Sequence, residues 1–193
     1  MGLRRTRAAA LGLVLLAPGA RGQEPTRGEQ MAQACAPCHG SNGNATDPLY
    51  PILAGQTVKY TYLQLKDYKE GRRNDVDMTP VTANLNKEDM LALATYFSEQ
   101  KPISIQFQPQ AERAARGKDR ADVTLCTSCH QGQYQGQNEI PRVAGQHPQY
   151  LKKQLLDFKS RARTNDAATM TSLAATLSDE NIEDIVQYLA GLY

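Results

Sequence analysis

The chain reads Cys35-Ala36-Pro37-Cys38-His39 near its start and Cys126-Thr127-Ser128-Cys129-His130 in its second half, and these stretches contain all four of its cysteines. Cys-x-x-Cys-His is the attachment signature of c-type haem, because two thiols on one helical turn can form thioether bonds to one porphyrin. The following histidine then supplies a proximal nitrogen to the iron. The pattern predicts two covalently bound haem c groups, with His39 and His130 as iron ligands.

Other uses of paired cysteines fit these stretches less well. A zinc ribbon places its two pairs roughly 15–20 residues apart, whereas Cys38 and Cys126 are far more widely separated, and the histidine after each pair would be unexplained. A thioredoxin-like redox pair follows a strand, but neither motif follows a β-branched run. A disulfide within either motif would be strained and would close almost no loop. Dithiol chemistry and zinc binding stay open as minor alternatives.

The first 22 residues have the pattern of an export signal. Arg4, Arg5 and Arg7 precede an apolar stretch, and Ala20-Arg21-Gly22 supplies small residues for a cleavage site. We predict a signal peptide at residues 1–22 and a periplasmic mature protein, because haem of this kind is attached outside the cytoplasmic membrane. A retained anchor is the alternative, although the apolar run is too short to span a bilayer.

Removal of this segment changes the sign of the net charge. The segment carries four arginines and no acidic residue, so its loss takes the formal charge of the chain from +2 to −2. Affinity for nucleic acid depends on clustered positive charge, and nucleic acid is therefore not expected as a partner. We expect a soluble protein, or one that reaches a membrane surface only through a partner.

The chain contains an internal repeat at a spacing of about 90 residues. Pro51-Ile52-Leu53-Ala54-Gly55-Gln56 is echoed by Pro141-Arg142-Val143-Ala144-Gly145-Gln146. Between the copies, Lys101–Pro109 contains two prolines and no helical period, which marks a linker. We predict one haem domain at residues 23–103, a linker at 104–110 and a second haem domain at 111–193.

Each copy has the pattern of a helical protein, and no stretch reads as a convincing strand. Thr26-x-x-Glu29 is spaced as a capping box before the first motif. Further helices are expected from near Thr57 to Lys69 and from near His147 to Lys159. Asn86 and Ser178 each begin a final helix, with acidic residues in the first turn and apolar residues at helical period. These apolar residues are Met90, Leu93, Ala94 and Phe97 in the first copy and Ile182, Ile185, Val186 and Leu189 in the second.

The second axial ligand of each iron must come from the remaining histidine or the methionines. His147 precedes a proline at a helix start, so we interpret it as a capping or solvated residue. Met31 lies before the first motif on the proximal side, and Met90 has core spacing. Met78 and Met170 match each other in the repeat and are expected in polar loops before the final helices. We predict Met78 and Met170 as the sixth ligands of the first and second iron.

The predicted ligand set favours one class of function. A thioether ligand favours ferrous iron and raises the haem potential, and it also closes the iron to peroxide and oxygen. Two His/Met centres therefore indicate an electron carrier and not an enzyme. A dihaem peroxidase would need an iron with an open or weakly held position. A dedicated cytochrome subunit of a periplasmic dehydrogenase shares all the local chemistry and stays open.

The chain resembles the dihaem class I cytochromes c, most closely those of the cytochrome c4 type. The resemblance rests on both Cys-x-x-Cys-His motifs, the Pro-x-x-Ala-Gly-Gln segment after each, and the Met-Thr pair before each final helix. It implies an all-α fold of two tandem cytochrome c domains, each with three or four helices around one haem, related by a pseudo-twofold axis. It also implies that the carbonyls of Pro51 and Pro141 accept the imidazole protons, and that Tyr96 and Tyr188 pack near the first helix of their domain.

The same resemblance implies the partners. Proteins of this type carry electrons between respiratory complexes, so we expect an electron donor complex on one side and a terminal haem–copper oxidase or another acceptor on the other. We expect the chain to be a monomer. The basic stretches Arg72-Arg73 and Arg161–Arg163 are interpreted as solvated loops, with contact to haem propionates or to a partner as the alternative.

Overall fold

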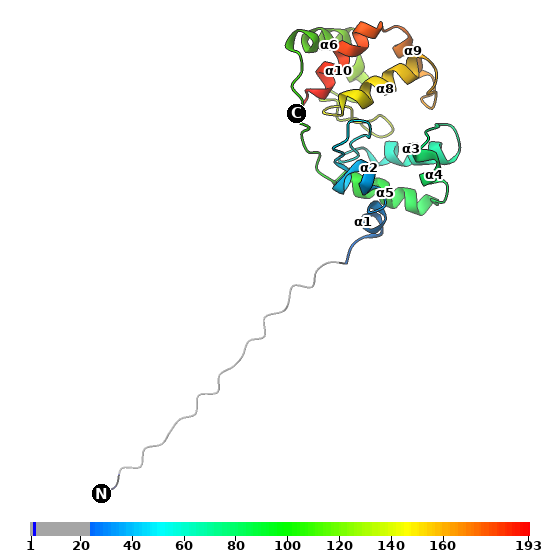
Figure 1. The fold of residues 1–193 in the computed structure, drawn as a ribbon, viewed down its shortest axis with the longest axis vertical. Coiled ribbons are helices and arrows are strands. Elements are labelled where there is room, and N and C mark those ends of the chain that lie inside the picture. The colour runs from blue at the N-terminus through cyan, green and yellow to red at the C-terminus, as the bar shows by residue number, and fades with distance from the viewer. Residues whose placement is uncertain (1, 3–23) are drawn as a thin grey trace.

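The structure, a computed structural model, describes residue 2 and residues 24–193. Apart from residue 2, the predicted signal peptide lies outside the described residues. Figure 1 shows two helical lobes stacked along the long axis, the first formed by α1–α5 and the second by α6–α10. Residues 101–110 carry neither helix nor strand and connect the lobes. The fold is thus all-α and tandem, as expected, while the exact domain boundaries stay a prediction.

The two lobes repeat the same order of helices. The first contains α1 (Arg27–Ala32), α2 (Ala36–His39), a 3-10 turn η1 (Ser41–Gly43), α3 (Val58–Lys69), α4 (Met78–Thr82) and α5 (Lys87–Glu99). The second contains α6 (Ala111–Val123), α7 (Cys126–His130), α8 (Pro148–Lys159), α9 (Thr169–Ala175) and α10 (Asp179–Ala190). Among the described residues, β pairing is limited to one isolated bridge between Gln137 and Ile140.

Local sequence explains most helix starts. The side chains of Thr26 and Thr57 accept hydrogen bonds from the backbone at the starts of α1 and α3. Asn86 and Ser178 form complete capping boxes at the starts of α5 and α10. Such caps satisfy backbone N–H groups that have no partner within the helix. The predicted starts are confirmed, although Thr26 forms only its own half of the predicted capping box. Helix α8 begins on a proline, where a missing N–H costs nothing.

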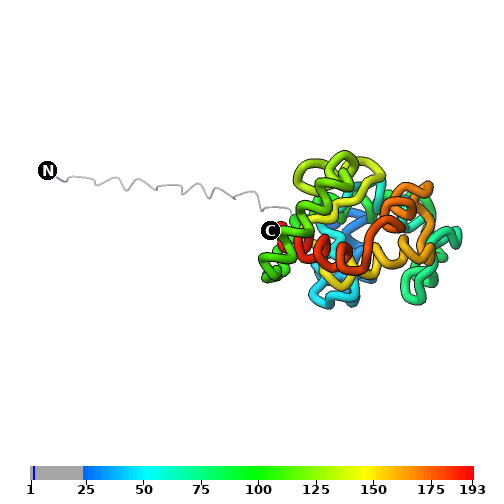
Figure 2. The backbone as a smooth tube through the Cα atoms, turned by 90° about the horizontal axis from the view of Figure 1, so that it is seen from above, coloured from blue at the N-terminus to red at the C-terminus, as the bar shows by residue number. Residues whose placement is uncertain are grey.

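The first and last helices of each lobe cross closely. Gly28 on α1 faces Ala92 and Tyr96 of α5, and Gly117 on α6 faces Asp184 and Ile185 of α10. Seen from above in Figure 2, α6 (green) runs beside the end of α10 (red). Because glycine has no Cβ, the two backbones can approach more closely than any other residue would permit.

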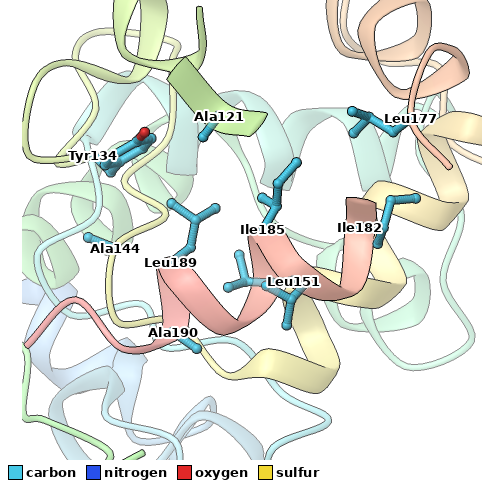
Figure 3. Packing of buried hydrophobic residues seen from close by; sticks show 10 residues of the cluster. Ala121, Tyr134, Ala144, Leu151, Leu177, Ile182, Ile185, Leu189 and Ala190 are labelled. Carbon is cyan, nitrogen blue, oxygen red and sulfur yellow. The ribbon is translucent and has the colours of Figure 1, made fainter. Parts of the chain in front are cut away.

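Apolar side chains under these crossings form the cores. In the first lobe a buried cluster consists of Ala32, Leu93 and Phe97. In the second lobe one buried cluster includes Ile182, Ile185 and Leu189 of α10, Leu151 of α8 and Ala121 of α6. Figure 3 shows Ile185 and Leu189 pointing to the side of α10 on which Ala121 lies. The predicted apolar stripe of the final helix is therefore the face that it buries, as a helical period requires.

Two glutamines join the lobes by reciprocal hydrogen bonds. Gln146 accepts from the Ile52 backbone N–H at 2.8 Å and donates to the Ile52 carbonyl at 3.0 Å. Gln56 does the same with Arg142, at 2.8 and 3.0 Å. Gln56 and Gln146, like Ile52 and Arg142, occupy matching places in the repeat. Such an exchange of equivalent contacts is what a twofold interface requires, and it supports the expected pseudo-twofold relation of the lobes.

A second cluster of polar residues lies between α3 and α8, and we call it the interface hub. It consists of Tyr60, Gln64, Arg73, Tyr150, Gln154, Arg163 and Asn165. Arg73 of the first lobe donates to Tyr150 and Gln154 of the second, and Arg163 donates to Tyr60 and Gln64 in return. The hub therefore repeats the same reciprocal pattern with charged donors.

Within the described part of the chain, every helix is too short or too polar to traverse a lipid bilayer.

Candidate haem sites

Both Cys-x-x-Cys-His stretches form a single helical turn. The first motif comprises Cys35 followed by α2, and the second coincides with α7. All four thiols are free; Cys35 and Cys126 are half-buried, whereas Cys38 and Cys129 are exposed. Burial raises the pKa of the Cys35 and Cys126 thiols, so both remain protonated at neutral pH. Two thiols on one turn of each lobe match what thioether attachment to a porphyrin needs.

The motif histidines are buried, with exposed fractions of 5% for His39 and 8% for His130. Nδ1 of His39 lies 3.0 Å from the carbonyl oxygen of Pro51, and Nδ1 of His130 lies 2.8 Å from that of Pro141. A carbonyl can only accept, so Nδ1 carries the proton and donates it. The expected proline contacts are confirmed. They leave the Nε2 atom of each ring unprotonated, with a lone pair available to bind a metal ion.

Burial also lowers the pKa of both histidines, and the proline hydrogen bond opposes it only in part. The carboxylate of Asp75 acts on His39 as well and raises its pKa slightly. Both imidazoles are therefore neutral near pH 7, which is the form that binds a metal ion. A neutral ring whose Nδ1 is fixed by a carbonyl has its tautomer and orientation set for ligation through Nε2.

The sequence suggested that Met78 and Met170 lie in loops, but the structure places both in short helices. Met78 is the first residue of α4, and Met170 is the second residue of α9. Asp75 accepts from the Met78 backbone N–H at 3.1 Å, and Asp166 holds the Thr171 side chain in α9 at 2.9 Å. These short-range contacts nucleate helical turns that periodicity alone does not reveal. Both methionines are half-buried, and their role as iron ligands stays a prediction.

The interpretation of the basic stretches as solvated is wrong for two of their residues. Arg73 and Arg163, with exposed fractions of 8% and 7%, form the centre of the interface hub. Each guanidinium also lies over an aromatic ring, at 4.6 Å from Tyr68 and 4.4 Å from Phe158 respectively. A surface that appears only when two lobes meet is not visible in a local sequence pattern.

His147 is neither a side-chain cap nor solvated. It is buried, and its Nε2 lies 2.8 Å from the carbonyl oxygen of Ala45 in the other lobe. Its ring thus serves the contact between the lobes, which agrees with its exclusion as an iron ligand.

The residues present fit a haem in each lobe. Each lobe offers two free thiols on one turn and a neutral imidazole with one available nitrogen. Arg142, next to Pro141, is buried, and its Nε has no hydrogen-bond partner among the described residues. A buried Nε–H without a partner calls for an acceptor, and a porphyrin brings propionate groups. The donor set and this unpaired atom both suit the group that the motifs predict.

Comparison with known proteins agrees with the geometry. The cytochrome c family model matches residues 25–101 and again residues 114–192. Cytochrome c4 of Pseudomonas aeruginosa is 38% identical over 192 residues, which is 95% of this chain and 94% of that protein. The crystal structure of reduced recombinant cytochrome c4 from Pseudomonas stutzeri superposes with a TM-score of 0.80 at 34% identity, over 86% of this chain and 97% of that one.

A further relative has a different name. A thiosulfate dehydrogenase electron acceptor of Stutzerimonas stutzeri is 31% identical over 95% of this chain and 92% of its own length. The repeated motif, the paired lobes and these matches all lead to one family. The chain belongs to the cytochrome c family, within the dihaem cytochromes c4, and it carries two covalently bound haem c groups, one in each lobe.

Proposed function

We propose that this protein is a periplasmic electron carrier, exported by a signal peptide at residues 1–22, that shuttles electrons between respiratory complexes. In this proposal Cys35 and Cys38 hold the first haem, and Cys126 and Cys129 hold the second. The haem groups supply one-electron chemistry when bound. The rest of the chain fixes their ligands, excludes reagents and presents them to partners.

The observation that carries the proposal is the pair of neutral, buried histidines anchored to Pro51 and Pro141. We assign His39 and Met78 as the axial ligands of the first iron, and His130 and Met170 as those of the second. Asp75 influences the pKa of His39 and holds the backbone of Met78, so the start of α4 lies near the first histidine. Two protein ligands on each iron would leave no position for peroxide or oxygen, which supports electron transfer over catalysis.

We further propose that the carrier delivers electrons toward a terminal haem–copper oxidase, as a monomer that meets its donor and acceptor in turn.

A second candidate is a dedicated electron acceptor for a periplasmic dehydrogenase. The relative of that description matches this chain over nearly its whole length. Purification of the protein from periplasm without crosslinker distinguishes the two. A catalytic subunit that copurifies in fixed ratio would replace the free shuttle.

Spectroscopy on the intact protein tests the ligand assignment. We expect two haems by mass, low-spin ferric iron at both centres, and a weak far-red band from methionine ligation. Met78→Ala and Met170→Ala should each remove about half of that band and lower one potential, since a thioether raises it. Met31→Leu is the matched control, because Met31 packs against the first-lobe core, and it should change neither the band nor the potentials. High-spin iron in the unaltered protein would overturn the assignment.

A further inference from the structure

Two peptide groups of this chain are hydrogen-bonded at both ends, and each bond goes to a different lobe. The carbonyl of the Pro51–Ile52 peptide accepts from His39 of its own lobe, and the N–H of that peptide donates to Gln146 of the other lobe. The Pro141–Arg142 peptide repeats the arrangement with His130 and Gln56. Each motif histidine is therefore one peptide group away from a glutamine of the opposite lobe.

Both glutamines are held without freedom to turn. Gln56 and Gln146 are 6% and 3% exposed. Each side-chain amide makes two hydrogen bonds across the interface, and its Oε1 atom also accepts one within its own lobe. Oε1 of Gln56 accepts from the Thr57 N–H at 3.0 Å, and Oε1 of Gln146 accepts from the His147 N–H at 3.0 Å. An amide that faces both an N–H and a carbonyl of one residue can satisfy them in only one orientation. The acceptor end of each glutamine is thereby directed at the peptide that holds the opposite histidine.

Hydrogen bonds in such a chain polarise one another. When the peptide N–H donates to a glutamine, electron density shifts toward the peptide carbonyl, which then becomes a stronger acceptor. A stronger acceptor draws the Nδ1 proton of the histidine more firmly and makes its Nε2 a more basic ligand. More basic nitrogen stabilises ferric over ferrous iron and lowers the potential of that centre.

We propose that Gln56 and Gln146 are positioning residues that tune the haem of the opposite lobe through these two peptide groups. Gln146 sets the strength of the His39 ligand, and Gln56 sets that of His130. The inference rests on the proposed ligation of iron by these histidines. It assigns to the contact between the lobes a role in the redox centres themselves, beyond holding the lobes together.

Replacement of each glutamine by methionine tests the proposal, since methionine keeps the length but lacks the amide. The potential of each haem is measured in the holo-protein by spectroelectrochemistry, with the two centres assigned by NMR. The exchange rate of each histidine Nδ1 proton is measured alongside. Gln146→Met should raise the potential of the His39 centre and speed exchange of its Nδ1 proton, and leave the His130 centre unchanged. Gln56→Met should raise the potential of the His130 centre and speed exchange of the His130 Nδ1 proton, and leave the His39 centre unchanged.

A matched control separates this role from a structural one. Gln64→Met makes the same replacement in the interface hub, where Gln64 binds Arg73, Arg163 and Asn165 but neither peptide. It should shift neither centre selectively. Gln146→Glu and Gln56→Glu keep an acceptor oxygen and should not raise the potential of the opposite centre, which keeps the test available where a methionine variant fails to fold.

The outcomes are separable. Equal shifts at both centres, shifts confined to the variant's own lobe, or an equal effect of Gln64→Met would overturn the tuning role. Absence of the low-spin spectrum or of the far-red band in the unaltered protein would overturn the proposed ligation instead. If the spectra are normal but neither methionine variant shifts the potential of the opposite lobe's haem alone, the proposed electron carrier still stands and only this inference is refuted.

Discussion

Gly117→Ala should destabilise the second lobe strongly for so small a change. Gly117 lies where α6 crosses α10, and a Cβ at this position would lie inside contact distance of the Asp184 carbonyl and 2.9 Å from the Ile185 nitrogen. These are backbone atoms of a helix, so they cannot rotate away as a side chain would. The two helices must instead separate by roughly 1.5 Å to reach the 3.5 Å or so that such contacts need.

The size of the effect follows from two opposing contributions. Overpacking typically costs about 1–3 kcal/mol, and a clash with rigid backbone belongs at the upper end, about 3 kcal/mol. The higher helix propensity of alanine returns about 1 kcal/mol. The free energy of unfolding should therefore fall by about 2 kcal/mol, which for a lobe of this size lowers the melting temperature by roughly 8–16 °C.

Thermal unfolding of the holo-protein, followed by far-ultraviolet circular dichroism, measures this change. Gly132→Ala is the matched control, because a Cβ there meets no atom within 4 Å and the backbone does not have a positive φ. It should stay within about 0.5 kcal/mol of the unaltered protein. If Gly117→Ala is as stable as this control, the close crossing of α6 and α10 is wrong.

Three other perturbations test separate parts of the fold. Asn86→Ala removes the capping box of α5 and Ser178→Ala that of α10, so each should cost about 1 kcal/mol of unfolding free energy in denaturant titrations; no loss in either would refute the role of the caps. Asp89→Asn should be less stable than the unaltered protein at pH 7. The hydrogen bond from Arg27 lowers the pKa of Asp89, and its backbone bond to Asn86 adds to this, so the ionised form stabilises the fold above the unfolded pKa. That contribution disappears as the pH falls below about 4, and the gap between the two proteins should close there; a gap that widens toward acid would contradict the reasoning. The haem-free chain should lack a cooperative melting transition in circular dichroism, because lobes of this size bury little surface without the porphyrin; a sharp native-like melt would disprove this.

Local chemistry in the sequence was enough to predict the capped helices and the proximal side of each site, but not the short helices α4 and α9, where loops were expected. Caps such as Asn86 and Ser178 act within one turn, and the two histidines follow directly from their motifs. The positions of Pro51 and Pro141 came from the family resemblance, and the structure places their carbonyls against the imidazoles.

The contact between the lobes could not be read in the same way. Arg73, Arg163 and His147 look like ordinary surface residues, because their partners lie roughly 80–100 residues away in the chain. In the sequence, Gln56 and Gln146 were notable only as matching residues of the internal repeat. Each occurs at the same distance after its proline, which indicates a role shared by both copies but not what that role is.

The reciprocal pairing of the lobes has a consequence for how the two centres can differ. In a dimer of identical subunits every substitution is present twice, and both metal environments must remain equal. In a tandem chain each half can change alone, and one pair of equivalent positions already has: Ile52 is an aliphatic residue where Arg142 is a buried cation. A single molecule can therefore hold two electrons at two different energies, and give them up in a fixed order.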